Sequence, residues 1–395
     1  MSYRFHKHLI LAFVLVLNID LSFADVWLYK PIFSLQGIGD DNRNLDEDDE
    51  KGTAGFDARG GVQLTRQADA SNFFIRGLLN SRRYDGGDDR GRDTDDQLFF
   101  SGANWETERS EFSVQGNYLR QSTSITEFED TGRVRTDERR ITRSVRPRYD
   151  YLISNNTRVF VAGGYTDVEF PSADPADFNE YDLVRASSGM AYSINELNTI
   201  TFTGYWQDFD VKKSINETES VGGAIRLDRI LSEQWNTYLG FGYRKSNFKF
   251  VNDNGATERD DDTGPVYEGG ISYQKSELDL FNFTVINTLQ PSSEGNVNEQ
   301  LRFNANYSRQ LSPRLIGVVN GFWLENESVN NNDQDDNREA WRASVGLNYR
   351  LTESWFLTGR YRHRYQKFVD RDNSSGANSN AILIGIRLDG RNKRI

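Results

Sequence analysis

The feature that most constrains this chain is an alternation of apolar and polar residues that returns segment after segment. Trp341, Ala343, Val345, Leu347 and Tyr349, for example, alternate with polar or small residues. Side chains alternate between the two faces of a β-strand, whereas in a helix they return to one face every three or four residues. The pattern therefore predicts strands that each have one apolar and one polar face.

The connections between these segments are of two kinds that take turns along the chain. Short ones, such as "QADAS", "ISNNT" and "LTESW", recur about every 40 residues. Long ones, such as "GDDNRNLDEDDEKG" and "NDNGATERDDDTG", are acidic and rich in Asn and Gly. Eighteen alternating segments lie between Pro31 and Arg387. Because this number is even, the first and last segments have their free ends on the side of the short turns.

These observations predict an all-β fold, an antiparallel transmembrane β-barrel of about 18 strands with short periplasmic turns and long acidic extracellular loops. A soluble β-propeller also has a repeat of this length, but its inner strands need apolar residues on both faces, and here one face is hydrophilic throughout. Six tryptophans near predicted strand ends would form the two aromatic girdles of such a barrel, namely Trp105, Trp206, Trp235, Trp323, Trp341 and Trp355.

The N-terminus has the pattern of a secretory signal peptide. Arg4 and Lys7 precede an apolar run over 9–17, and Ser22, Phe23 and Ala24 form a small-x-small cleavage site. We expect residues 1–24 to be removed and residues 25–395 to form a single barrel domain. The chain has no Cys, which excludes disulfides and thiolate metal sites.

Arginines recur on the polar face of the predicted strands. The stretch "GRYRHRYQKF" places Arg360, Arg362 and Arg364 on one face and three rings on the other. In a membrane barrel the polar face lines the lumen, so we expect an arginine-rich wall that favours anions. The alternative is that these arginines pair with lumen carboxylates and only brace the barrel. The other expected lining residues are Arg59, Arg76, Arg146, Arg148, Arg185, Arg226, Arg244, Arg302, Arg342 and Arg350, together with Arg387.

Other chemistry is poorly supported. His363 is the only histidine beyond the signal segment, and its phase places it on the apolar face, so neither a multi-histidine metal site nor a Ser-His-Asp triad is expected. Asp333, Asp335 and Asn337 begin like a calcium loop, but Arg338 stands where that motif needs glycine. We therefore predict no enzyme activity, no cofactor and no metal. The net charge of −12 argues against nucleic acid as a partner.

In length and pattern, including the runs "YRHRYQKF" and "AILIGIRLDG", the chain resembles Gram-negative outer-membrane β-barrel proteins associated with exopolysaccharide and exosortase gene clusters. The resemblance implies a cell outer-membrane location and contact with lipid and lipopolysaccharide. It also implies a role as an export pore for polysaccharide, alongside periplasmic polysaccharide-export proteins. The basic tail "RNKRI" departs from the terminal aromatic residue that such barrels often have.

Three functions remain open from the sequence. The main one is a conduit that exports a secreted, acidic polysaccharide. The second is an uptake porin for anionic oligosaccharides or small solutes, which needs the same wall chemistry. The third is a structural or adhesive surface barrel whose lumen is filled by its own side chains.

Overall fold

The computed structural model describes residues 26–47, 50–85, 93–132, 138–171, 178–212, 216–251, 257–329, 337–369 and 376–394. The expected signal peptide, residues 1–24, lies outside the described residues, as do Asp333 and Asp335 of one acidic loop. Within these ranges, no helix is long and apolar enough to cross a membrane.

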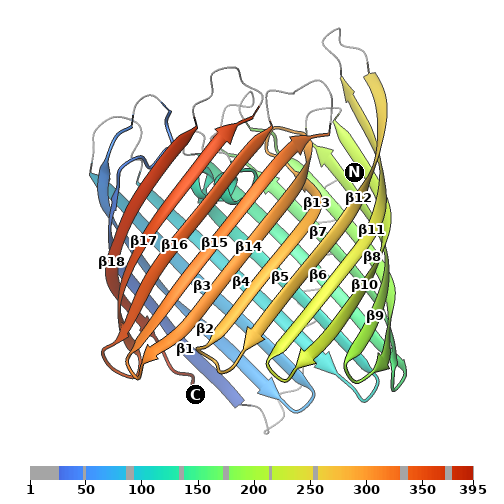
Figure 1. Ribbon diagram of the computed structural model, residues 1–395, viewed down its shortest axis with the longest axis horizontal. Coiled ribbons are helices and arrows are strands. Elements are labelled where there is room, and N and C mark those ends of the chain that lie inside the picture. The colour runs from blue at the N-terminus through green and yellow to red at the C-terminus, as the bar shows by residue number, and fades with distance from the viewer. Residues whose placement is uncertain are drawn as a thin grey trace.

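The described chain is almost entirely strand (Figure 1). The strands are β1 (Val26–Asp40), β2 (Thr53–Ala68), β3 (Ser71–Asp85), β4 (Thr94–Glu106), β5 (Ser110–Ser122), β6 (Arg139–Ser154), β7 (Thr157–Glu169), β8 (Tyr181–Asn195), β9 (Asn198–Val211), β10 (Glu217–Ser232), β11 (Trp235–Val251), β12 (Thr257–Gln274), β13 (Leu280–Pro291), β14 (Val297–Ser312), β15 (Leu315–Ser328), β16 (Arg338–Arg350), β17 (Trp355–Phe368), β18 (Ala377–Asp389) and the two-residue β19 (Lys393–Arg394). One helix, α2 (Thr123–Asp130), follows β5.

Each of the eighteen long strands pairs antiparallel with its neighbour in sequence, and β1 also pairs with β18. This last pairing runs from Ile32 opposite Asp389 to Asp40 opposite Ala381, and it closes the sheet into a barrel. The predicted antiparallel barrel of eighteen strands is confirmed. The first strand begins at Val26, a few residues before the predicted Pro31, and β19 adds a short pairing of the basic tail with Leu28 and Tyr29 of β1.

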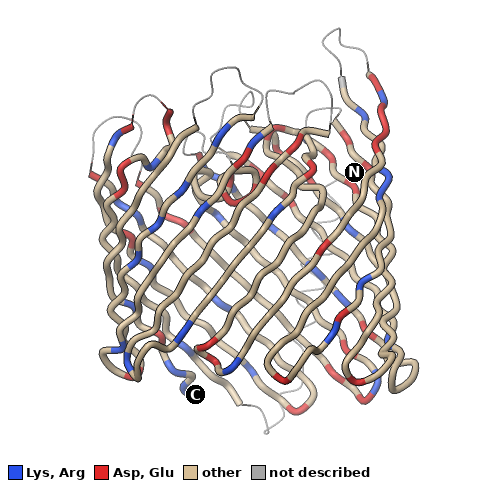
Figure 2. The backbone as a smooth tube through the Cα atoms, viewed as in Figure 1, with Lys and Arg blue, Asp and Glu red and all other residues tan. Residues whose placement is uncertain are grey.

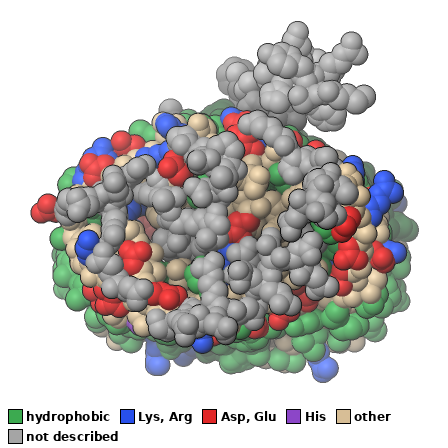
Figure 3. Space-filling model, turned by 90° about the horizontal axis from the view of Figure 1, so that it is seen from above, with side chains coloured by type: hydrophobic (Ala, Val, Ile, Leu, Met, Phe, Trp, Pro, Cys, Tyr) green, Lys and Arg blue, Asp and Glu red, His purple; other side chains and the backbone are tan. Residues whose placement is uncertain are grey.

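The two faces of the barrel differ as the alternation predicts. Seen from the loop end, hydrophobic side chains surround the outer wall (Figure 3). Exposed large apolar residues such as Leu79, Ile225 and Ile384 belong to this wall. The six tryptophans lie toward strand ends: Trp105, Trp235 and Trp355 beside short turns, and Trp206, Trp323 and Trp341 in the halves nearer the long connections. An apolar wall of this kind suits contact with lipid because hydrocarbon offers polar side chains no hydrogen-bond partners.

Helix α2 was not predicted, and it lies inside the barrel. It is contacted by Arg140 of β6 and, from the opposite part of the wall, by Arg302 of β14, Phe322 of β15 and Arg342 of β16. Strands so far apart in the barrel can touch one short helix only if it lies in the lumen. Figure 1 shows α2 behind the front strands, near the loop end. Its Phe128 belongs to a buried apolar cluster with Leu45, Phe322, Leu324, Ala340 and Ala377.

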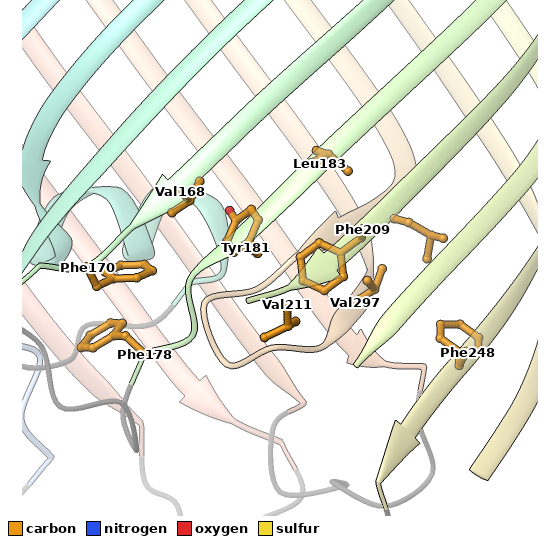
Figure 4. Close-up of a cluster of buried hydrophobic side chains, with 10 residues drawn as sticks. Val168, Phe170, Phe178, Tyr181, Leu183, Phe209, Val211, Phe248 and Val297 are labelled. Atoms are coloured by element: carbon orange, nitrogen blue, oxygen red, sulfur yellow. The ribbon is translucent and has the colours of Figure 1, made fainter. Parts of the chain in front are cut away.

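The hairpin tip between β13 and β14 also turns inward. Ser293 donates a hydrogen bond of 2.6 Å to Glu127 of α2, and Glu294 forms an ion pair of 2.7 Å with Arg338 of β16. A second buried cluster lies against this hairpin (Figure 4). Its members are Val168, Phe170, Phe178, Tyr181, Leu183, Phe209, Val211, Phe248, Leu289 and Val297. The outer half of the lumen is therefore partly filled by folded-in segments.

Candidate functional site

The candidate site is the lumen wall, which the strand register defines. Residues directly opposite each other in a sheet share a face. Arg342, which contacts α2, lies opposite Arg364 of β17, and Arg364 lies opposite Ser379 of β18, so all three are on the lumen face. Continuing in this way around the barrel places all the arginines expected on the polar face, with Arg387, on the face that α2 contacts. Whether they line a conducting channel stays a prediction.

Helix α2 is anchored to this wall by polar contacts as well as by Phe128. Arg342 donates a hydrogen bond of 2.8 Å to the Glu129 carboxylate, and Arg302 donates one of 3.0 Å to the Glu129 carbonyl. Gln300 and Asn326 donate to the carbonyls of Asp130 and Thr131, at 2.7 Å and 2.5 Å. These bonds satisfy carbonyls that the end of any helix leaves without partners.

Glu127 of α2 is a buried carboxyl. It accepts hydrogen bonds from Arg140 at 3.2 Å and from Ser293 at 2.6 Å. Burial raises the pKa of Glu127 above its usual range, because the ionised form loses its hydration, and the nearby Arg140 only partly offsets this effect. Glu127 thus joins three separate segments: α2, β6 and the β13–β14 tip.

A second polar centre closes the seam between the first and last strands. Asp40 at the end of β1 accepts from Arg362 at 3.0 Å, from Arg364 at 3.2 Å and from Ser379 at 2.7 Å. Arg364 also donates to the Arg43 carbonyl at 2.8 Å. Two of the three arginines of "GRYRHRYQKF" are therefore held by one carboxylate near the loop end.

The expected lining arginines fall into three groups by partner. Ion pairs to described carboxylates hold Arg148, Arg226, Arg244, Arg342, Arg362 and Arg364. Arg185 donates to Gln207 at 2.9 Å, and Arg302 donates to Asn304 and to the α2 backbone. In the described part of the chain, no carboxylate pairs with the remaining members, Arg59, Arg76, Arg146, Arg350, Arg360 and Arg387.

Some of the expected lining arginines do form ion pairs that connect neighbouring parts of the barrel wall. Arg244 is 1% exposed and bridges Asp262 and Glu299, each at 2.6 Å. Arg226 pairs with Asp228 at 2.7 Å and lies 3.9 Å from the centre of the Tyr238 ring. Three carboxylates of this wall, Asp40, Asp96 and Asp150, each form ion pairs with arginines. Figure 2 shows most acidic residues near the two ends of the barrel, whereas Lys and Arg also lie along the strands between.

The unpaired arginines gather mainly on the wall formed by β16, β17, β18, β1 and β2. One register row crosses these strands in the order Arg350, Phe356, Arg387, Ser34 and Arg59. The Arg350 and Arg387 guanidinium carbons lie 5.9 Å and 5.1 Å from the centre of the Phe356 ring. Arg360 lies four residues beyond Phe356 on β17. The charged side chains that act on it are those of Arg362, Arg342 and Arg387, and all three are cationic.

Sequence reasoning missed the residues that fill the lumen, namely Asp40, Glu127, Glu129, Arg140 and Ser293. A signal existed for α2, because Ile125 and Phe128 are three residues apart in a stretch that lacks strand alternation. No comparable signal marks Asp40 or Ser293, whose partners lie 339 and 166 positions away.

His363 lies on the outer face rather than in the lumen. Its Nδ1 is 2.8 Å from the Asn380 side-chain oxygen, and its ring centre is 4.7 Å from that of Trp341. Among the residues that the structure describes, no cluster of three or more His, Asp or Glu side chains is arranged to hold a metal ion.

No protein-family model and no curated protein sequence matches this chain. Solved structures do resemble it. Pseudomonas aeruginosa OccK2 (OpdF) aligns with a TM-score of 0.48 and 10% identity, over 92% of this chain and 97% of that one. Acinetobacter baumannii OccAB1 aligns with a TM-score of 0.47 and 10% identity, over 92% and 96%.

The copper transporter OprC aligns with a TM-score of 0.44 and 9% identity, over 88% of this chain. The chain spans 62% of the length of OprC. The strand pairing of this chain is itself that of a closed, porin-like β-barrel.

Proposed function

We propose that this protein is an outer-membrane channel through which small anionic solutes, including short anionic oligosaccharides, cross passively. The observation that carries the proposal is the set of lumen arginines that no described carboxylate neutralises, above all Arg350, Arg360 and Arg387. A wall of fixed cations raises the local concentration of anions and lowers that of cations.

The folded-in segments support small solutes rather than a bulky polymer. Helix α2 is bound to β6 on one side and to β14 and β16 on the other, so it crosses the outer half of the lumen. A polymer chain needs a continuous wide path past these contacts, whereas a small solute needs a narrower one. Export of an acidic polysaccharide with periplasmic partners uses the same wall chemistry and remains the competing proposal.

The outer face supports a location in the outer membrane, and export by the N-terminal segment is part of the proposal. Exposed apolar side chains such as Phe202, Ile225 and Phe241 lie on neighbouring strands of that face. Lipid and lipopolysaccharide are the surroundings that such a surface fits.

The test is the reversal potential of the purified protein in a planar bilayer under a KCl gradient. We expect the wild type to prefer chloride over potassium, and Arg360→Gln to reduce that preference. The control is Arg83→Gln, which removes the same charge from an arginine that pairs with Asp95 at 3.0 Å near the loop-side end of β3. A wild type that conducts no ions, or that prefers cations, contradicts the proposal.

The direction of transport is tested in cells. Deleting the gene should slow growth on an anionic oligosaccharide while leaving the amount of surface polysaccharide unchanged. Loss of surface polysaccharide with normal growth would instead support the export hypothesis.

A further inference from the structure

We infer that the wall from β16 to β2 contains a binding subsite for a hydroxyl-rich molecule with two anionic groups, a short acidic oligosaccharide. The inference rests on the proposed anion channel and goes further, since it names a ligand class and the residues that bind it. The subsite consists of Arg350, Arg387 and Arg59 in one register row, Arg360 farther along β17, and neutral polar residues between.

The first anchor is the row that holds Arg350, Arg387 and Arg59. Phe356 is 8% exposed and lies between the first two arginines, which contact its ring from the strands on either side. The Nε atoms of Arg350, Arg387 and Arg59 are all buried, and none has a hydrogen-bond partner among the described residues. Phe356 and Ser34 separate the three cations within the row, so an anion that binds there can accept charge-assisted hydrogen bonds from more than one strand.

The second anchor is Arg360, four residues from Phe356 on the same face of β17. At the rise of an extended strand, the backbones of the two rows are about 13 Å apart. A small dicarboxylate has no hydroxyl groups that could bind the neutral polar residues between the two rows. A short acidic oligosaccharide has carboxylates on separate sugar rings and hydroxyl groups between them, so it can use both the arginines and the neutral residues.

The row between the anchors is neutral. It runs from Asn348 through Thr358 and Gly385 to Gln36. Thr358 donates to the Gly385 carbonyl at 3.2 Å and keeps its hydroxyl lone pairs free to accept. The side-chain amides of Asn348 and Gln36 form no hydrogen bond with other residues that the structure describes. Free amides can both donate to and accept from sugar hydroxyl groups.

Carboxylates near the subsite do not neutralise it, because each is held by another cation. Asp57 is the register partner of Gln36 on β2, and its carboxylate accepts a hydrogen bond of 3.0 Å from Arg82. Asp389, two residues beyond Arg387, pairs with Lys30 at 2.6 Å. The positive charge of the subsite is therefore left for a ligand.

The experiment measures block of the single-channel current by trigalacturonate, with maltotriose and glutarate as probes. Maltotriose has the hydroxyl groups without the charge, and glutarate has two carboxylates without the length or the hydroxyl groups. We expect trigalacturonate to interrupt the current at concentrations where the other two do not. The double variant Arg350→Gln/Arg387→Gln should raise the half-blocking concentration by about tenfold or more, because it removes charge-assisted hydrogen bonds.

Two further variants sharpen the result. Asn348→Ala should weaken block by trigalacturonate although it removes no charge, and Arg83→Gln should leave the block as it is in the wild type. Equal block by glutarate and trigalacturonate, or a double variant that is blocked like the wild type, overturns the inference. If chloride preference persists in that case, only the subsite is wrong. If chloride preference is absent from the wild type, the proposed function has failed as well.

Discussion

Arg342 and Glu129 are 213 positions apart in the chain, yet the guanidinium group of one donates a hydrogen bond of 2.8 Å to the carboxylate of the other. This contact joins the wall at β16 to a helix that leaves the wall after β5. Together with the Arg140 contact to Glu127 on the other side, it holds α2 across the lumen. The lumen is therefore shaped by tertiary contacts between residues that are remote in sequence.

Breaking this contact should loosen α2. Arg342→Glu places a carboxylate opposite Glu129, and we expect larger fluctuations of the single-channel current than in the wild type. Both side chains are partly exposed, so the pair contributes at most about 1 kcal/mol. The swap Arg342→Glu/Glu129→Arg restores opposite charges and should return the fluctuations toward the wild type. If the current of the swapped variant fluctuated as much as that of Arg342→Glu, the pair would not be what holds α2.

The stability with which α2 packs in the lumen, here called its seating, should depend on pH through Glu127. Because burial raises the pKa of Glu127 in the seated state, the neutral form is favoured there, and seating is strongest below the carboxyl's usual pKa. Stability is lost as the pH rises from that value through the raised pKa. Arg140, Asp130 and Glu294 are the charged groups that act on this carboxyl.

The measurement is hydrogen exchange of the α2 amides, corrected for intrinsic rates, at about pH 5 and about pH 8. We expect greater protection at the lower pH in the wild type. Glu127→Gln keeps the oxygen that accepts from Ser293 but cannot ionise, so its protection should be the same at both values. Equal protection in the wild type would exclude Glu127 as the titrating group.

Gly132, which follows the C-terminal end of α2, should be needed for the chain to turn beside the lumen wall. Its φ of +76° is a left-handed conformation, and a Cβ there would lie 2.8 Å from both the Ala340 Cβ and the Leu324 Cδ1. Gly132→Ala should weaken the seating of α2 by about 1–3 kcal/mol. Hydrogen exchange of α2 measures the effect. Gly60→Ala is the control, because a Cβ at Gly60 meets no atom within 4 Å and its φ is not in the left-handed region.

Removing the buried cation Arg244 should destabilise the barrel. Arg244→Met leaves Asp262 and Glu299 without their cationic partner, and because water can partly solvate these carboxylates, the free energy of unfolding should fall by about 1–3 kcal/mol. Urea unfolding from lipid vesicles measures this loss. The neighbouring Lys245→Met removes an exposed ion pair with Asp261 and should change the value by at most about 1 kcal/mol. Similar effects of both substitutions would contradict the structural role of Arg244.

A charge on the outer face should be costly. Ile225 lies between Phe202 and Phe241 on that face, and Ile225→Arg should lower the free energy of unfolding in lipid by up to about 2–4 kcal/mol. Thr203→Arg places the same side chain on the lumen face of the adjacent strand and should cost much less. If the two variants were equally stable, the assignment of the faces would be wrong.

The sequence by itself determined the strands and their faces. Alternation separates Trp341 and Val345 from Arg342 and Ser344 without knowledge of the fold, because a strand turns successive side chains to opposite sides. Short turns such as Asn195 to Asn198 fixed which strands are neighbours. Closure of β1 on β18 was predicted because one face of each strand is hydrophilic, which suits a membrane barrel with a polar lumen and no free sheet edge.

Only the tertiary structure decided which arginines are neutralised and what fills the lumen. Arg362 and Arg360 are equivalent in the sequence pattern, yet Arg362 is held by Asp40, 322 positions away, and Arg360 is not. Helix α2 likewise owes its place to Arg342, Arg302 and Arg140. Alternation is a local property of the backbone, whereas an ion pair across a barrel depends on how far each strand is shifted against its neighbours, which becomes fixed only when the whole sheet closes.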